Sequence, residues 1–345
     1  MSPTSHFQAR TVVVCLLVLT AATALFSLGF GPSEIGMSDA LRSAAHHVFG
    51  TGSAPDRTTD AILWRLRAPR IVVAALVGAC LALAGTLLQG LFRNVLAAPG
   101  VIGTTAGASF GAVLALSLGW AAWSVWALPT AAMCAALGSL VIVTAVARTQ
   151  GRTPVTTLLL AGVALTAFLS AINGWMLARS YSDFELARRI AYWILGGVAD
   201  RGWQHAGLVA PALLLGLLAA SRLAVDLDLM LQGEETAETL GVPVERSKRF
   251  VLIVAAILVG AAVSVAGVIG FVGLVVPHIL RMLIGPSHRP LVWASAIGGA
   301  AFLVAADLFA RSVAASELQL GIVTSFVGAP FFLYLLTRQR ADELW

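Results

Sequence analysis

The residue types that could do chemistry are concentrated in one stretch of the chain, residues 222–249. Only 11% of the 345 residues are charged. This stretch nevertheless holds Arg222, Asp226, Asp228, Glu234, Glu235, Glu238, Glu245, Arg246, Lys248 and Arg249. Within it, GEETAETLGV at residues 233–242 predicts a short helix, because acidic residues favour the positive end of a helix dipole and Gly241 and Pro243 can end a helix. A solvated loop is the alternative. The long apolar segments on both sides favour a compact helical element that faces solvent.

The residues required for catalysis or metal binding are not found together. Lys248 is the only lysine; no GxxxxG precedes it, so a Walker A nucleotide site cannot be built. The motifs HExxH and CxxC are also absent. The three cysteines lie in apolar runs, and the neighbouring His46 and His47 would point different ways on a helix. We therefore expect neither an enzyme nor a metal site, and no ATP hydrolysis by this chain alone.

The composition predicts an all-α polytopic membrane protein. Hydrophobic residues make up 59% of the chain and the mean hydropathy is +0.89, which leaves too little polar surface for a soluble domain. A membrane-spanning helix needs about 20 mostly apolar residues. Ten candidate spans lie at residues 11–30, 69–91, 101–119, 125–147, 154–178, 203–222, 250–268, 270–284, 290–310 and 319–337. We expect one transmembrane domain over residues 1–345, with 222–249 as a cytoplasmic loop between two halves.

The first apolar run, residues 11–30, is expected to be a retained helix with the N-terminus inside the cell. A secretory signal peptide is the alternative, but this run exceeds the usual length of about 7–15 apolar residues. Residues 37–49 predict a short amphipathic surface helix after it.

The basic residues indicate docking rather than nucleic-acid binding. The net charge is +5, but the arginines lie at span ends and form no basic stripe interleaved with aromatic residues. Three arginines within residues 65–70 exceed what anchoring a helix in the interface requires, and this suggests a patch for an acidic partner. A further outer group, Arg179, Arg188 and Arg189, suits either an anionic ligand or a docking partner.

The sequence GVIG occurs twice, at residues 100–103 and 267–270, each time after the leading helix of one half. Glycine-interrupted spans at corresponding positions are typical of an inverted repeat, with the transport site between the halves. Gly103, Gly107 and Gly111 share one helix face and predict close helix packing.

Two intramembrane polar features remain. The run Gln89, Arg93 and Asn94 at the inner end of the second span indicates a narrow point on a translocation path, because polar groups there are costly unless they line water or protein. Asp307 and Arg311 are spaced for an i,i+4 ion pair; the alternative is a proton-carrying carboxylate in a secondary transporter.

Several motifs together resemble those of the FecCD family, the permease subunits of binding-protein-dependent ABC importers for iron-siderophores, haem and cobalamin. They are LRAPR, LAGTLLQGLFRNVLAAPGVIGTTAGASFG, GEETAETLGV, GVIGFVGLVVPHILR, ADLFAR and ELQLGIVTSFVGAPFFLYLL, in the family's order. The resemblance covers about residues 10–338.

The resemblance implies ten transmembrane helices per subunit and a homodimer with the pathway at its interface. It also implies two ATP-binding subunits that carry ATP and Mg, a periplasmic or lipoprotein substrate-binding protein, and a bacterial inner-membrane location. The chain itself would bind no cofactor. We expect an iron chelate, a ferric siderophore or haem, as substrate, with cobalamin as the alternative.

The resemblance also assigns residues. The coupling helix that contacts the ATPase would comprise Gly233, Glu234, Glu235, Ala237, Glu238, Leu240 and Gly241. Arg67, Arg70 and Arg311 match the outer arginines that pair with glutamates of the binding protein. Asn94, Leu96 and Thr153 match positions at the inner gate. The chain departs from the family's NPLADP-like run at Val95 and Ala98, which affects the expected shape of that loop.

Overall fold

The computed structural model describes residues 3–30, 35–51, 56–149, 151–313 and 317–342, and this part of the chain is helical. The first half contains α1 (Pro3–Gly29), α2 (Met37–Phe49), α3 (Arg57–Ala61), the π-helical η1 (Ile62–Arg67), α4 (Ala68–Phe92), the 3-10 turn η2 (Pro99–Ile102), α5 (Thr104–Ser117), η3 (Trp120–Ala122), α6 (Ala127–Ala147), α7 (Val155–Arg179), η4 (Ser180–Ser182) and α8 (Phe184–Leu195). The second half contains α9 (Trp203–Met230), α10 (Glu234–Thr239), α11 (Val244–Ala266), α12 (Val272–Ile284), α13 (His288–Val313) and α14 (Leu320–Asp342).

The ten predicted spans each correspond to one helix. Among the described residues, seven helices are long and apolar enough to cross a membrane, and they contain α1, α4, α6, α7, α9, α11 and α13. Three shorter apolar segments, Thr104–Ser117, Val272–Ile284 and Leu320–Tyr334, account for the other predicted spans. The amphipathic surface helix predicted at residues 37–49 is α2.

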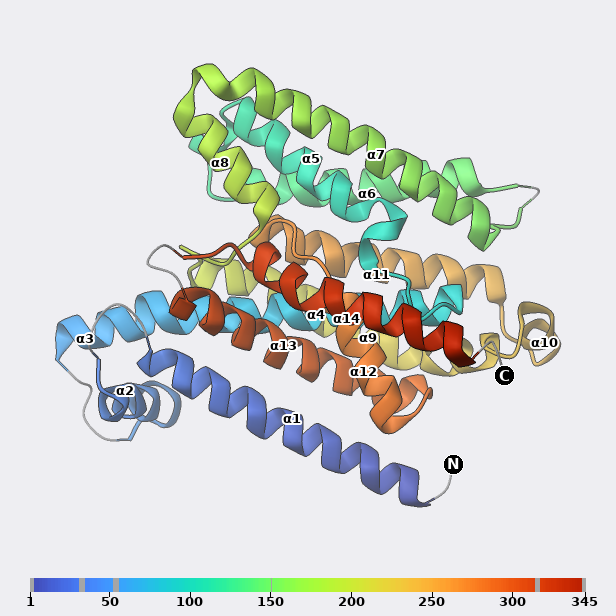
Figure 1. Ribbon diagram of the computed structural model, residues 1–345, viewed down its shortest axis with the longest axis horizontal. Coiled ribbons are helices and arrows are strands. Elements are labelled where there is room, and N and C mark those ends of the chain that lie inside the picture. The colour runs from blue at the N-terminus through green and yellow to red at the C-terminus, as the bar shows by residue number, and fades with distance from the viewer. Residues whose placement is uncertain (1–2, 31–34, 52–55, 150, 314–316, 343–345) are drawn as a thin grey trace.

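The two GVIG sequences hold equivalent places in two halves of the fold. Each follows a long helix, α4 or α11, and precedes a short one, α5 with 14 residues or α12 with 13. The carbonyl oxygen of Val101 in the first GVIG faces Gly162 of α7, and that of Val268 in the second faces Gly321 of α14. Because α4 and α11 run side by side in opposite directions (Figure 1), α4–α7 and α11–α14 form an inverted repeat.

Helix α4 forms the centre of the bundle, and its residues are buried along nearly its whole length. It packs against α9, α11, α12 and α13. Two of these contacts depend on glycine, because Gly78 faces the backbone of Gly299 in α13 and Gly85 faces the backbone of Gly273 in α12. Small residues on both helices let their backbones approach closely.

The close helix packing predicted for the glycines of this segment is confirmed for Gly107 and Gly111. A Cβ atom built on Gly107 would lie 2.6 Å from the carbonyl oxygen of Ala135 in α6, and Gly111 lies equally tightly against Ala131. Gly103, the first glycine of the series, instead precedes α5 with a φ of +78°, a conformation that glycine adopts readily.

Helices α5 to α8 form a layer on one side of α4 and α11, and α1 lies on the opposite side (Figure 1). Helix α7 carries many exposed apolar residues, among them Leu160, Phe168 and Trp175. An apolar exposed face of this kind is suited to lipid or to a second membrane subunit.

Candidate functional site

The predicted short helix is α10, held between the ends of α9 and α11. Gly233 before it and Gly241 after it have φ values of +119° and +88°, so both turns use conformations that favour glycine. Ala237 is fully buried and anchors the helix, whereas Glu235, Glu238 and Leu240 are exposed. The structure therefore presents an acidic face with one apolar residue to solvent.

Lys248 connects α10 to the turn before α7. Its side chain is only 5% exposed, and its Nζ lies 2.6 Å from Glu234 Oε2 and 3.0 Å from Glu245 Oε1. The other carboxylate oxygen of Glu245 accepts a hydrogen bond of 3.2 Å from the backbone N–H of Thr153. This chain of contacts links Glu234, which we predicted to contact the ATPase, to Thr153, which we predicted to lie at the gate. The spacing of these residues in the sequence did not reveal the link.

Much of the polar stretch 222–249 is helical rather than loop. Helix α9 continues eight residues past the predicted span end at 222, to Met230, and α11 begins at Val244 rather than at 250. The carboxylates of Asp226 and Asp228 are satisfied inside the protein. Asp226 accepts a 2.6 Å hydrogen bond from Ser247, and Asp228 accepts a 2.8 Å bond from the backbone N–H of His288.

The predicted gate residues lie in two turns at the inner end. Asn94 and Leu96 follow α4, where the side chain of Asn94 accepts a 2.9 Å hydrogen bond from the backbone N–H of Leu96. The backbone carbonyl of Asn94 also accepts a bond of 3.1 Å from Ala97, so this turn forms without the family's proline at position 95. Thr153 precedes α7.

Gln89 is buried at the inner half of α4, and both polar atoms of its side chain have hydrogen-bond partners in the protein. Its side-chain nitrogen donates to the carbonyl of Leu274 over 3.2 Å, and its oxygen accepts a weak 3.4 Å bond from Arg281. Gln89 therefore joins α4 to α12 and does not itself line an open path.

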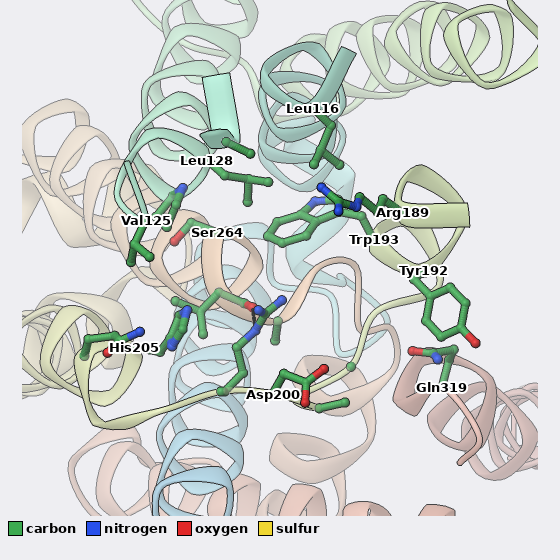
Figure 2. A pocket seen from close by; sticks show the side chains of 18 of the residues that line it. Leu116, Val125, Leu128, Arg189, Tyr192, Trp193, Asp200, His205, Ser264 and Gln319 are labelled. Carbon is green, nitrogen blue, oxygen red and sulfur yellow. Dashed lines mark hydrogen bonds between the residues drawn. The ribbon is translucent and has the colours of Figure 1, made fainter. Parts of the chain in front are cut away.

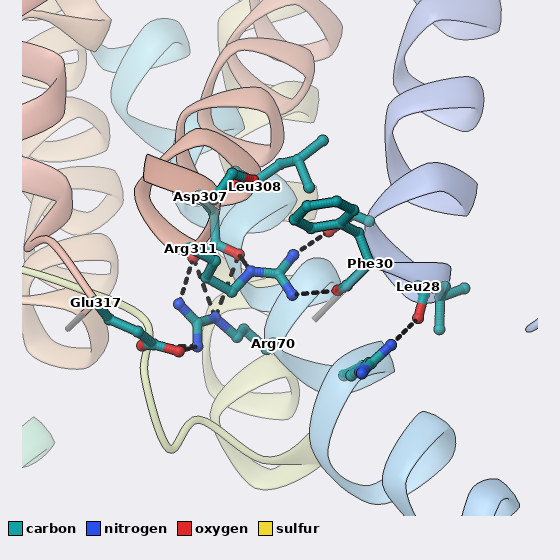
Figure 3. Close-up of polar contacts among 10 residues, drawn as sticks. Leu28, Phe30, Arg70, Asp307, Leu308, Arg311 and Glu317 are labelled. Atoms are coloured by element: carbon teal, nitrogen blue, oxygen red, sulfur yellow. Dashed lines mark hydrogen bonds and ion pairs between the residues drawn. The ribbon is translucent and has the colours of Figure 1, made fainter. Parts of the chain in front are cut away.

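At the opposite end of the bundle, Arg70 and Arg311 surround the carboxylate of Asp307 (Figure 3). Arg70 Nη2 lies 2.8 Å from Asp307, and Arg311 Nε lies 3.1 Å from it, which confirms the predicted i,i+4 pair. Asp307 is 1% exposed. The second partner of Arg70 is Glu317, at 2.9 Å from Nη1.

The same arginines fasten the end of α1 to α4 and α13. Arg311 donates to the carbonyl of Phe30 over 3.2 Å and to the hydroxyl of Ser27, and Arg67 donates to the carbonyl of Leu28 over 2.8 Å (Figure 3). Arg67 and Arg311 are buried. The outer arginines therefore form hydrogen bonds and ion pairs within this chain. Glu317 is the most exposed of the side chains with which they pair.

Of the three arginines predicted to contact substrate, the structure places Arg179 apart from Arg188 and Arg189. Arg179 lies over the ring of Trp175, with its Cζ 5.8 Å from the ring centroid. Arg188 and Arg189 both pair with Glu185 at 3.1 Å on the surface of α8. These hydrogen bonds hold the pKa of the Glu185 carboxyl below its ordinary value.

Arg189 alone of the three reaches a cavity of about 490 Å³, which it lines together with Tyr192, Trp193 and Arg201 (Figure 2). No sequence pattern indicated Arg201 as a ligand residue. The available signal was its position after the glycines at 196 and 197, in a turn between an amphipathic helix and a span. No group of three or more His, Cys, Asp or Glu residues that could hold a metal ion occurs in the described part of the chain.

The chain has an acidic helix at one end and an arginine cluster at the other. Its sequence also matches a known protein family over nearly its whole length. The FecCD transport family matches residues 18–338. The chain belongs to the FecCD transport family. It is the multi-pass membrane permease subunit of an ABC importer, and ATP hydrolysis is carried out by other subunits.

Three relatives illustrate the breadth of the family. The chain is 44% identical to the cobalamin import system permease protein BtuC of Halobacterium salinarum, over 83% of this chain and 76% of that protein. It is 38% identical to the hemin transport system permease protein HmuU of Yersinia pestis, over 97% and 98% of the two chains. A solved metal-chelate type ABC transporter in an inward-facing conformation matches with a TM-score of 0.83 and 31% identity, over 95% of this chain and 99% of that one.

Proposed function

We propose that this permease moves an iron chelate, haem or a ferric siderophore, across the membrane by alternating access between two copies of the chain. The observation that carries the transport mechanism is α10, whose acidic face is exposed while Ala237 beneath it is fully buried. A small rigid element of this kind is suited to dock in a groove of an ATPase subunit. The apolar exposed face of α7 is suited to lie against the second copy.

Energy enters through α10 in this proposal. If the nucleotide states of the ATPase contact Glu235, Glu238 and Leu240 differently, those contacts change the balance between the inward-open and outward-open forms. Lys248 and Glu245 connect this movement to Thr153, at the start of α7. No covalent chemistry on the substrate is required.

At the outer end, a loaded binding protein would dock through acidic side chains near Arg67, Arg70 and Arg311. These arginines already have partners inside the chain. An acidic side chain of the binding protein would therefore pair with the arginine whose present partner is the most exposed. Arg70 is the suitable residue, because one of its two carboxylate partners, Glu317, has a side chain that is 44% exposed.

The iron-chelate assignment is supported by the full-length similarity to the hemin permease. Cobalamin is the second candidate, favoured by the higher identity, 44%, to the cobalamin permease. The two are distinguished by purifying the cognate binding protein and titrating it with haem, cobalamin and a siderophore panel. Binding of haem or a ferric siderophore supports the iron assignment, and binding of cobalamin alone contradicts it.

The coupling role is tested by reversing charge on the exposed face of α10. We expect Glu235→Lys with Glu238→Lys to abolish stimulation of the ATPase by the loaded binding protein, because like charges or lost contacts prevent productive docking. The matched control is Glu185→Lys, which reverses an exposed charge at the other end of the bundle. Full stimulation in the α10 variant, with the permease inserted normally, would refute the coupling role.

A further inference from the structure

The cavity lined by Arg201 lies at the end of the bundle opposite to α10. Its walls come from α8, the N-terminus of α9, the C-terminus of α11 and the turn between α5 and α6 (Figure 2). Helix α9 has 28 residues, so at 1.5 Å per residue about 42 Å separates its two ends. With α10 on the inner side, the cavity is reached from the outer side. Its volume of about 490 Å³ is within the range of small-molecule sites.

The guanidinium of Arg201 is held in this wall by one of its nitrogen atoms, and its other N–H groups remain available as hydrogen-bond donors. Its Nε donates to the carbonyl of Val265 over 2.7 Å, and its Cζ lies 5.7 Å from the centroid of the Trp193 ring. Within the described residues, the two Nη groups of Arg201 have no hydrogen-bond acceptor. A guanidinium held in this way is arranged to bind a carboxylate through two parallel hydrogen bonds.

Trp193 supplies a second donor. Its side chain lines the same cavity, the residue is 8% exposed, and its indole N–H is buried without an acceptor in the described structure. Buried polar groups nearly always have a partner, so an acceptor brought by a ligand would complete this one. The unpaired N–H and the fixed guanidinium are independent observations on one cavity.

Arg201 is the cation of this cavity that is left for a ligand. Arg189, Arg201 and Asp200 line the wall, and Arg189 is already paired with Glu185 at 3.1 Å. Burial lowers the pKa of Arg201, and the neighbouring Asp200 offsets this only in part, so a bound anion would stabilise the charged form. Trp193 and Tyr192 add aromatic surface for the body of a ligand.

We propose that this cavity binds the carboxylate group of a small anionic molecule that arrives from the outer side. The carboxylate could belong to the imported chelate or to a free organic acid, and both offer the same chemistry to Arg201 and Trp193. In the first case the inference rests on the proposed function and adds an outer contact for the substrate.

The test uses the permease with its ATPase subunits in nanodiscs without nucleotide, and equilibrium dialysis with radiolabelled citrate. We expect saturable binding of citrate and none of its uncharged trimethyl ester. Arg201→Gln is expected to weaken the Kd about tenfold or more, and Trp193→Phe about threefold, because a charged and a neutral hydrogen bond are lost. Arg42→Gln, which removes the same charge from the exposed surface of α2 outside the cavity wall, is expected to leave the Kd unchanged.

Absence of saturable citrate binding would overturn the proposal, as would equal weakening by Arg42→Gln and Arg201→Gln. Arg201→Lys keeps the charge and serves where the glutamine variant does not fold; it should bind citrate with intermediate affinity. If citrate does not bind but Arg201→Gln abolishes docking of the binding protein, the cavity accepts an acidic protein side chain, which also overturns the proposal.

The source of the carboxylate is distinguished by competition. Displacement of citrate by haem, but not by haem dimethyl ester, indicates the chelate, whereas displacement only by organic acids indicates a free anion. The variant with Glu235→Lys and Glu238→Lys should retain citrate binding, so failure of the coupling role and failure of this site give different results.

Discussion

Arg70 holds two carboxylates that differ greatly in burial. The side chain of Asp307 is 1% exposed and that of Glu317 is 44% exposed. Breaking a buried pair leaves an uncompensated charge and costs about 3–5 kcal/mol, whereas an exposed pair is worth about 0–1 kcal/mol. A carboxylate from a docking partner could therefore replace Glu317 readily but not Asp307.

We predict that Glu317→Gln strengthens docking of the loaded binding protein, because the variant removes an internal competitor for Arg70. The measurement is the Kd by surface plasmon resonance at several salt concentrations, with the effect largest at low salt. Asp39→Asn, which removes another acidic charge near the outer end, serves as the control and should change the Kd less. Weaker docking in Glu317→Gln would argue that Glu317 stabilises the docking surface instead of competing for it.

The burial of Asp307 also bears on the rival interpretation as a proton-coupled carrier. Its carboxylate pairs with both Arg70 and Arg311, and the pair with Arg70 joins α13 to α4. A structural ion pair accounts for this intramembrane acid.

At the scale of helices, α4 packs closely against α12 and α13 because glycines lie at the points of contact. Gly85 faces the backbone of Gly273, so a methyl group there must push α4 and α12 apart. We predict that Gly85→Ala destabilises the permease by about 1–3 kcal/mol, the range for overpacked cores. The control is Gly174→Ala in α7, where a Cβ atom meets open space and the change should be neutral or stabilising by up to about 1 kcal/mol. Thermal unfolding in one detergent compares them, and equal melting temperatures for both variants would contradict the packing argument.

The link from α10 through α11 to α7 makes a prediction about coupling. Helix α7 packs mainly against α5, α6, α8 and η2, so the bond between Glu245 and the Thr153 N–H is a direct polar contact with α11. We predict that Lys248→Met lowers transport per ATP hydrolysed about 5-fold or more while ATPase stimulation persists, since coupling energies are typically about 1–3 kcal/mol.

Arg246→Met is the control for this experiment, because Arg246 is exposed on the same helix and carries the same charge. Glu245→Gln keeps an acceptor for the Thr153 N–H and should lose less coupling than Glu245→Ala. Unchanged transport per ATP in Lys248→Met would mean that movement of α10 reaches α7 by another route.

Sequence patterns predicted the helices themselves well but not their ends in the polar stretch. Residues 37–49 were bounded correctly because glycines flank an amphipathic run. The end of α9 was placed too early because Asp226 and Asp228 read as loop residues. Their partners, Ser247 and His288, lie 21 and 60 residues away, and no local pattern reveals that these carboxylates are satisfied within a helix bundle.

The same limit applies to the site residues. The glycines and acidic residues of α10 were predictable because capping and exposure are local properties. The burial of Arg67 and Arg311 was not, since their partners Leu28 and Phe30 lie in a different helix and at its end. The cavity at Arg201 is formed by segments far apart in the sequence, and the glycines at 196 and 197 were the only local signal beside it.

At the scale of the whole molecule, the repeated halves α4–α7 and α11–α14 interlock, because α4 of the first half packs against α11, α12 and α13 of the second. The sequence predicted this repeat from the two GVIG motifs, and the equivalent contacts of Val101 and Val268 give it a physical basis. Because the chain is the permease subunit of an ABC importer, the ATPase subunits supply the energy for uphill transport.

The most direct measurement is uptake of the cognate chelate by proteoliposomes that contain the permease with or without its ATPase subunits. The account predicts uphill uptake only when the ATPase subunits, ATP and the loaded binding protein are all present. Uphill uptake by the permease alone, driven by a proton gradient or by no added energy source, would contradict it.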